Sequence, residues 1–177
     1  MNTKAEFIES IRNLADGPAA QNAVSAYLRE CLTRWGGAPP WLGAPIKAEL
    51  DLWFADSTVS VFSIVWPPHF ITEPHNHCMW ATVAIYQGRE NNLYWERSGS
   101  SIRVTGGGSA KAGDVINLPE KAIHSVHNPV NEYTGAIHVY GGDFPNAPRS
   151  EWDPLLLTER PRDMDRAAEA FRESDIG

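Results

Sequence analysis

The feature that most restricts the fold of this chain is a run of short apolar or alternating segments between residues 48 and 140. These segments cover residues 59–66, 79–86, 101–105 and 135–140, and turn-forming glycines separate several of them. Successive side chains on a strand point to opposite faces, so short alternating segments between turns are typical of strands that bury one face. The sequence therefore predicts an all-β barrel or sandwich as the core.

Segments with helical periodicity flank this core on both sides. Apolar residues recur at helical spacing over residues 4–14 and 24–35, and Gly36 is well placed to cap the second segment. A third amphipathic segment follows Pro161, after a proline-rich stretch at 145–154. We expect this third segment to form a helix that packs outside the barrel.

The length and composition of the chain favour a single domain. With 177 residues and 42% hydrophobic content, the chain can bury one substantial core but is short for two. We expect one domain over residues 1–177, with helices in 1–44, the β-barrel in 45–144, and a proline-rich connection followed by a C-terminal helix in 145–177.

The charge balance of the chain is acidic. Lys and Arg total 15 against 22 Asp and Glu, and the formal net charge of -7 repels phosphate backbones and anionic lipids. No apolar run approaches the roughly 20 residues of a membrane span, and the first ten residues lack the basic start of a signal peptide. We expect a soluble, cytoplasmic protein with no nucleic-acid or membrane partner and no disulfide between Cys31 and Cys78. Its oligomeric state stays open.

Two histidines lie two residues apart, at His75 and His77, directly after Pro74. On a strand, side chains at this spacing leave the same face and can converge on one metal ion. Imidazole is a ligand for iron, zinc, copper and nickel. The spacing therefore predicts a metal site and leaves the metal open.

A second block of interest covers residues 113–128. Gly113 and Asp114 can form a tight turn into a short apolar strand, and Pro119 prevents that strand from continuing as a paired central strand. His124 comes just after this bend. We expect the bend to direct His124 toward the inside of the barrel.

Together the two blocks resemble the sequence pattern of the cupins, which fold as a double-stranded β-helix, or jelly-roll barrel. The first cupin block carries His-x-His and closes on a glycine, which is Gly88 here. The second has a glycine, a proline, a histidine and an asparagine at set spacings, and these are here Gly113, Pro119, His124 and Asn128. The resemblance implies a metal held by His75, His77 and His124.

The expected ligand set differs from that of many cupins, which place a ligating Glu four or five residues after the second histidine. Here Ala81 and Thr82 stand at those positions. A face of three histidines resembles the thiol dioxygenases, of which cysteine dioxygenase is the best known. Neutral ligands leave a ferrous ion its full charge, which a substrate thiolate can compensate. This resemblance implies Fe(II) as cofactor, and a small thiol and O2 as substrates of an enzyme that forms the sulfinate.

Residues 136–140 resemble the Ser-x-His-x-Tyr strand of the thiol dioxygenases. Ala136 replaces the serine, and alternation places Ala136, His138 and Tyr140 on one face. By resemblance, His138 and Tyr140 are the catalytic residues, a relay beside the metal. The cysteine that animal enzymes cross-link to this tyrosine is replaced here by Thr82, so we expect no thioether cross-link.

Two residues are candidates for substrate binding. Arg149 lies nine residues after Tyr140, a spacing that resembles the bacterial 3-mercaptopropionate-type branch, whose late arginine binds the substrate carboxylate. A guanidinium fork suits a bidentate carboxylate. Trp80, close to the first metal block, is the tryptophan that we expect to contact substrate. The implied substrate is 3-mercaptopropionate or a cysteine-like thiol.

Two other classes of function stay open at this point. The chain could be a metal cupin of another enzyme class, such as an organic-ring dioxygenase or an isomerase, because one fold hosts many reactions. It could also be a non-catalytic cupin that binds a small ligand or a partner at the barrel mouth. Zinc or nickel in the purified protein would favour the first class, and failure to bind ferrous iron would favour the second.

Overall fold

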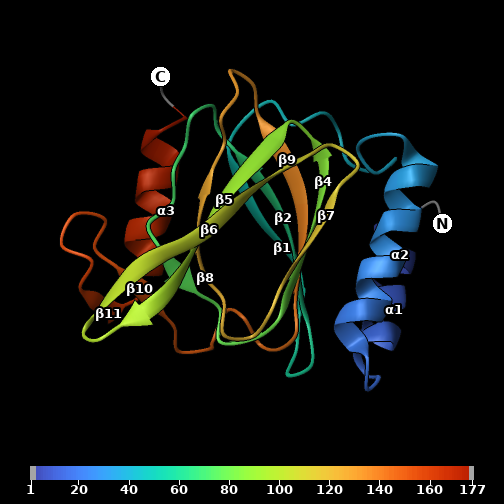
Figure 1. The fold of residues 1–177 in the computed structure, drawn as a ribbon. Helices are drawn as coiled ribbons and strands as arrows, with labels where there is room; N and C mark the ends of the chain where they lie inside the picture. The colour runs from blue at the N-terminus through green and yellow to red at the C-terminus, as the bar shows by residue number, and fades with distance from the viewer. Residues whose placement is uncertain (1–2, 176–177) are drawn as a thin grey trace.

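The computed structural model describes residues 3–175 and consists of two facing sheets flanked by helices (Figure 1). The helices are α1 (Lys4–Ala15), α2 (Ala20–Trp35) and α3 (Met164–Glu173). The strands are β1 (Glu49–Ala55), β2 (Ser60–Trp66), β3 (His75–Asn76), β4 (Ala81–Gln87), β5 (Arg89–Ser98), β6 (Ser101–Lys111), β7 (Val115–Leu118), β8 (Ile123–His127), β9 (Thr134–Tyr140), β10 (Ser150–Trp152) and β11 (Glu159–Pro161).

The two sheets are built from antiparallel pairs. One sheet has five strands in the order β1-β2-β9-β4-β7, and the other has six in the order β11-β10-β3-β8-β5-β6. After β2 the chain passes from one sheet to the other between consecutive strands, except from β5 to β6 and from β10 to β11, which are paired within the six-stranded sheet. The predicted all-β core with helices at both ends is confirmed, in the arrangement of a double-stranded β-helix.

The outer face of the five-stranded sheet is covered by α1 and α2 (Figure 1). Val61, Ile137 and Val139 on this face pack with Phe7 and Leu28 of the two helices, and all five are fully buried. Burial of such side chains is worth about 1.5–3 kcal/mol each. The two N-terminal helices thus close one side of the barrel and lie outside its interior.

The ends of these elements follow the local chemistry of the sequence. Helix α2 ends at Gly36, which adopts a left-handed conformation and donates its N–H to the carbonyl of Leu32 at 3.0 Å, as the sequence predicts. Gly88, between β4 and β5, has a φ of +78°, and a Cβ there would lie 2.3 Å from Oγ1 of Thr134. Only glycine fits this turn.

The inner face of the five-stranded sheet lines the interior of the barrel. Ala136, His138 and Tyr140 of β9 share this face, as alternation predicts, and all three are buried. Phe62 and Val83 are the residues opposite His138 on β2 and β4. A central strand therefore carries two polar side chains into the barrel interior.

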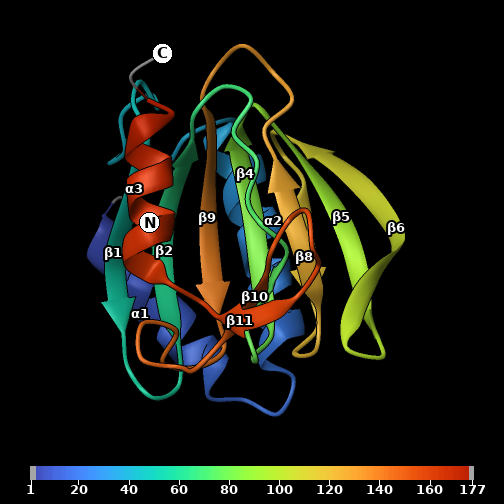
Figure 2. The same ribbon diagram turned by 90° about the vertical axis from the view of Figure 1, so that its left-hand side faces the viewer.

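The C-terminal region differs from the sequence-based expectation. Short strands β10 and β11 lie within the segment expected to be a connection, and β10 pairs with β3 through Glu151 and His75. Helix α3 lies outside the strands, as expected, on the side opposite α1 and α2 (Figures 1 and 2), and it also lines the interior cavity described below. Three-residue strands are too short to show a sequence period, which is why the expectation failed here.

Helix α3 is tied to the barrel at its C-terminal end. Oδ1 of Asp175 accepts hydrogen bonds from the backbone N–H of Ala48, at 3.0 Å, and from the hydroxyl of Tyr133, at 2.7 Å. Phe171 of α3 is buried against the barrel. Within residues 3–175, no helix is long and apolar enough to cross a membrane.

Candidate metal centre

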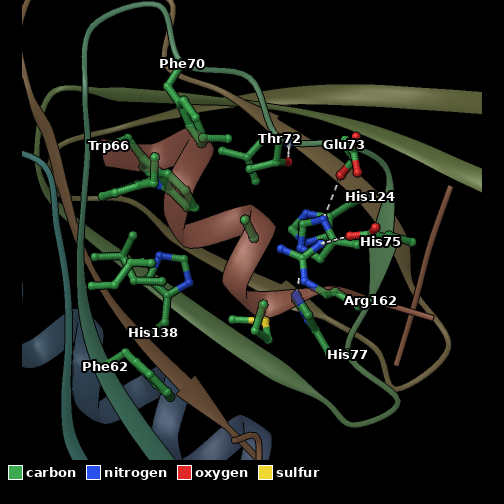
Figure 3. A pocket seen from close by; sticks show the side chains of 18 of the residues that line it. Phe62, Trp66, Phe70, Thr72, Glu73, His75, His77, His124, His138 and Arg162 are labelled. Carbon is green, nitrogen blue, oxygen red and sulfur yellow. Dashed lines mark hydrogen bonds and ion pairs between the residues drawn. The ribbon is translucent and has the colours of Figure 1, made fainter. Parts of the chain in front are cut away.

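Three histidines converge inside the barrel, on the strands of the six-stranded sheet. His75 and His124 are direct partners in the β3–β8 pair, and His77 follows β3 by one residue. One ligand atom from each lies within 4.8 Å of the other two, and the three side chains point toward one another in Figure 3. The ring centroids of His75 and His124 are 4.7 Å apart. The structure thus brings together the three predicted metal ligands.

Neighbouring groups orient two of these imidazoles. Nδ1 of His75 lies 2.9 Å from the carbonyl oxygen of Glu73, and Nδ1 of His124 lies 2.6 Å from Oδ1 of Asn92. Nδ2 of Asn92 donates to Glu90 at 2.9 Å, which turns the Asn92 oxygen toward His124. Since both oxygens only accept, His75 and His124 carry their protons on Nδ1 and keep a lone pair on Nε2.

The Nε2 lone pairs of the histidines face a shared point in the buried interior of the barrel. Nε2 of His124 lies 3.2 Å from Nε2 of His77, and all three side chains are buried. Burial, together with the positive charge of Arg162, lowers the pKa of each histidine, to about 3 for His124. Three neutral imidazoles, two of them oriented by hydrogen bonds, are the kind of donor set that a divalent transition metal prefers. The residues present therefore fit a metal ion.

Glu90 and Asn92 were not among the residues predicted from the sequence. Both are buried on β5, and Glu90 also accepts a hydrogen bond from Nε1 of Trp66 at 3.1 Å. Burial raises the pKa of the Glu90 carboxyl. Glu90 and Asn92 are two residues apart just after Gly88, which puts both side chains on one face of a strand. This spacing is the sequence pattern that could have identified them as site residues.

The predicted relay residues lie beside the histidine cluster. The hydroxyl of Tyr140 is 3.2 Å from Nδ1 of His138, and the rings of Tyr140 and His77 have centroids 5.0 Å apart. Burial lowers the pKa of His138 to about 3 and raises the pKa of Tyr140, so both groups are neutral near pH 7. Nε2 of His138 is buried without a hydrogen-bond partner among the described residues, and Ala136 offers no hydroxyl to it.

A cavity of about 300 Å³ contains these groups. Its polar end holds the histidine cluster and Arg162, and its apolar end lies next to Trp66 and Phe70 (Figure 3). The remaining walls come from β2, β8, the segment before β3, the loop after β9, and α3; they include Phe62, Ile64, Thr72, Val126, Phe144, Met164, Ala167 and Phe171. The cavity is therefore a chamber for a small molecule in contact with the candidate metal site.

The two predicted substrate-binding residues do not line this cavity. Arg149 is buried, with its guanidinium carbon 3.7 Å from the ring centroid of Phe144, which in turn stacks on Tyr140. Trp80 packs against Gly141 and the apolar cluster under α1 and α2. Arg149 thus acts on the site only through its charge, behind Phe144, and the structure does not bring Trp80 to the chamber.

Two cationic residues line the cavity, Arg162 and Arg166, and sequence reasoning missed both. The side chain of Arg162 is 13% exposed, and its Nε atom is buried without a hydrogen-bond partner in the described part of the chain. Figure 3 shows its guanidinium beside His75 and His124. Arg162 lies between β11 and Asp163, the N-cap of α3, where no local sequence pattern indicates a site.

A network of ion pairs surrounds this end of the cavity. Glu73 forms ion pairs with Arg160 at 2.9 Å and with Arg166 at 3.1 Å. Glu151, which is buried, forms ion pairs with the same two arginines and lies 3.8 Å from Arg162, and Asp153 pairs with Arg160 at 3.4 Å. Arg162 is thus the arginine of this network with the weakest pairing, and its Nε atom has no hydrogen-bond partner within residues 3–175. A guanidinium with spare donors suits an anionic group.

Both cysteines are free, as the sequence predicts. Cys31 is buried in α2, and Cys78 is exposed. Cys78 follows a candidate ligand directly but adopts a positive φ of 56° and turns away from the cavity lining. Neither thiol therefore belongs to the candidate metal centre.

Comparisons with known proteins give structural neighbours only. No protein-family model and no curated protein matches the chain. Among solved structures, an RmlC-like cupin family protein from Methanocaldococcus jannaschii is similar at 12% identity and a TM-score of 0.48, over 59% of this chain and 89% of that one. A protein with a double-stranded β-helix domain from Klebsiella pneumoniae has 17% identity and a TM-score of 0.47, over 62% and 83%.

An enzyme also appears among the solved structures. Oxalate oxidase in complex with the substrate analogue glycolate has 14% identity and a TM-score of 0.44, over 59% of this chain and 55% of that one. These three neighbours are thus a cupin family protein, a protein with a double-stranded β-helix domain and an oxalate oxidase, and none of the three is a thiol dioxygenase.

Proposed function

We propose that this protein is an iron(II)-dependent dioxygenase that converts a small thiol and O2 to the corresponding sulfinate. The observation that carries the proposal is the neutral three-histidine cluster with the His138–Tyr140 pair beside it in one chamber. The donor set lacks a carboxylate, so a bound ferrous ion would keep a charge that a thiolate can neutralise. When bound, that iron supplies the centre at which thiolate and O2 react.

The residues of this chain have separate roles in the proposed reaction. His75, His77 and His124 hold the metal, and Asn92 keeps His124 in the tautomer that binds. Arg162 attracts and orients the anionic group of the substrate, since it lines the cavity and its Nε donor has no hydrogen-bond partner within residues 3–175. Tyr140, protonated near pH 7, is the proton donor next to the reacting groups.

Arg149 remains a second candidate for the substrate anchor. Its charge reaches His77 and Tyr140 although its side chain lies behind Phe144. One of its terminal nitrogens, Nη1, is buried without a hydrogen-bond partner within residues 3–175. Movement of Phe144 would bring this guanidinium to the cavity.

Oxygen consumption by iron-loaded protein tests the proposal. We expect uptake with 3-mercaptopropionate or cysteine and less with cysteamine, which has no carboxylate for Arg162, together with sulfinate formed in equal amount. His124→Ala should lose most bound iron and all uptake, whereas His69→Ala, a histidine outside the cavity lining, should keep both. Absence of uptake with all three thiols would refute the thiol reaction.

An alternative that the cavity favours is a metal-dependent enzyme acting on a non-thiol substrate. The lining of the chamber is mostly apolar, which also suits an organic ring. Metal analysis of the purified protein separates the two, because zinc or nickel in the histidine site would exclude direct oxygen chemistry at iron.

A further inference from the structure

The apolar end of the cavity is closed by three aromatic rings. Trp66 and Phe70 stack with centroids 5.8 Å apart, and Phe171 of α3 meets them edge-on at 5.7 Å and 5.2 Å. The only polar atom of Trp66, its Nε1, is already bonded to Glu90. The ring faces therefore offer contact to an apolar group and no hydrogen bond.

This aromatic end is continuous with the metal site but chemically distinct from it. Ile64 and Val126 line the cavity and belong to the same apolar cluster as Trp66 and Phe171, and Met164 and Ala167 of α3 also line it. The charged residues of the lining gather at the other end, around Arg162 (Figure 3). The chamber thus has one end for an anion and a metal, and one for an apolar group.

A three-carbon thiol acid would use only the first of these ends. With its thiol at the histidines and its carboxylate at Arg162, it has no atoms left for the aromatic end. That apolar surface would then stay in contact with water, although burying it favours binding by about 25 cal/mol per Å². Pockets of about this size commonly enclose most of the surface of their ligands.

We infer that the substrate is a thiol acid that also carries an aromatic or branched aliphatic group, and that this group occupies the end formed by Trp66, Phe70 and Phe171. The inference rests on the proposed function for the thiol and on the cavity for the apolar group. The thiol and the anion lie close together in such a molecule, and the apolar group branches away from them.

A matched pair of substrates tests this inference. The probes are 3-mercaptopropionate and 2-benzyl-3-mercaptopropionate, which differ only by the benzyl group. With iron-loaded protein we expect kcat/KM to be about ten-fold or more higher for the benzyl compound, since a hydrophobic pocket discriminates by at least that factor for a group of this size. The thiol-free 3-phenylpropionate should bind to the same protein in a calorimetric titration.

A matched pair of variants locates the effect. Ala167→Phe places a ring in the cavity and should reduce the kcat/KM ratio of the two thiols to about one and weaken 3-phenylpropionate binding. Ala168→Phe adds the same ring on the same helix at a half-buried position outside the lining, and should leave the ratio unchanged. Thermal melting of both variants shows whether α3 remains folded.

The outcomes separate this inference from the proposed function. Turnover of 3-mercaptopropionate without any gain from the benzyl group, and without binding of 3-phenylpropionate, would overturn the inference and leave the thiol reaction standing. Binding of 3-phenylpropionate that Ala167→Phe weakens, without oxidation of either thiol, would support the apolar subsite and overturn the thiol chemistry alone.

Discussion

His124 donates the proton on its Nδ1 atom to Oδ1 of Asn92 at 2.6 Å, deep in the barrel. Asn92 can accept this bond because its amide nitrogen is engaged by Glu90 at 2.9 Å. The chain Glu90–Asn92–His124 therefore fixes which imidazole nitrogen faces the metal site. Such partners are as much a part of a metal centre as its ligands.

Replacing Asn92 should weaken metal binding while leaving the ligands in place. In Asn92→Ala, His124 loses the acceptor that fixes its tautomer, and we expect iron affinity to fall about 10- to 100-fold. Titration against a competing chelator measures this change. Asn131→Ala removes an amide from an exposed loop and should bind iron as the parent protein does. Equal iron affinities for the parent protein and both variants would contradict the role of Asn92.

The two buried arginines should differ in their effect on substrate. Arg162→Met removes the guanidinium that lines the cavity. We expect kcat/KM for 3-mercaptopropionate to fall about 10- to 100-fold, because the loss of one hydrogen bond to a charged group weakens binding by about this factor. Cysteamine, which lacks a carboxylate, should be affected much less. Arg149→Met is the matched comparison: a larger loss there than in Arg162→Met would show that Phe144 moves and that Arg149 is the anchor.

Tyr140→Phe should separate chemistry from metal binding. The variant keeps the ring that packs on Phe144 and His77 but loses the hydroxyl that bonds to His138. We expect kcat to fall about 100-fold or more, as for loss of a general acid, with iron content unchanged. Single-turnover product analysis with metal quantification checks both points, and full activity of the variant would exclude Tyr140 as the proton donor.

The stability of the metal-free protein should depend steeply on pH. Burial lowers the pKa of His75, His77, His124 and His138, so the folded state binds fewer protons than the unfolded state, whose histidines titrate near 6.5. Stability is therefore fully present above about pH 6.5 and is lost as pH falls below it. Each such histidine contributes about 1.4 kcal/mol per pH unit.

Urea unfolding of chelator-treated protein between pH 5 and 7.5 measures this dependence. His138→Gln should show a smaller decrease in the free energy of unfolding toward low pH, because one buried histidine is removed. A free energy of unfolding that stays constant over this range would mean that the four imidazoles are not buried as neutral groups.

The histidine cluster that forms the candidate metal site could be predicted from the sequence because local geometry determines it. His75 and His77 are related by the period of a strand, and His124 follows a bend set by Pro119, so short stretches of chain carry the information. Pairing of His75 with His124 across β3 and β8 then required only that both blocks belong to one barrel. The same holds for His138 and Tyr140, which share a face of β9.

The cationic end of the cavity could not be predicted in this way. Arg162 reaches the site only because β10 and β11, each three residues long, pair beside β3 and return the chain to the barrel mouth. Such pairing depends on packing between distant segments, and no periodicity in the local sequence predicts it. For Arg149 the obstacle is a single ring, since Phe144 lies between its guanidinium and Tyr140.

The position of helix α3 at the cavity affects how this protein can change in evolution. The helix supplies one wall of the cavity from the last part of the chain, whereas the histidines and the relay come from the barrel strands. It is held at its far end by Asp175. Under the proposed function, the metal ligands and the relay are therefore encoded in one stretch of the gene and part of the substrate lining in another, so exchange of the C-terminal helix between relatives would alter the cavity while leaving the histidines in place.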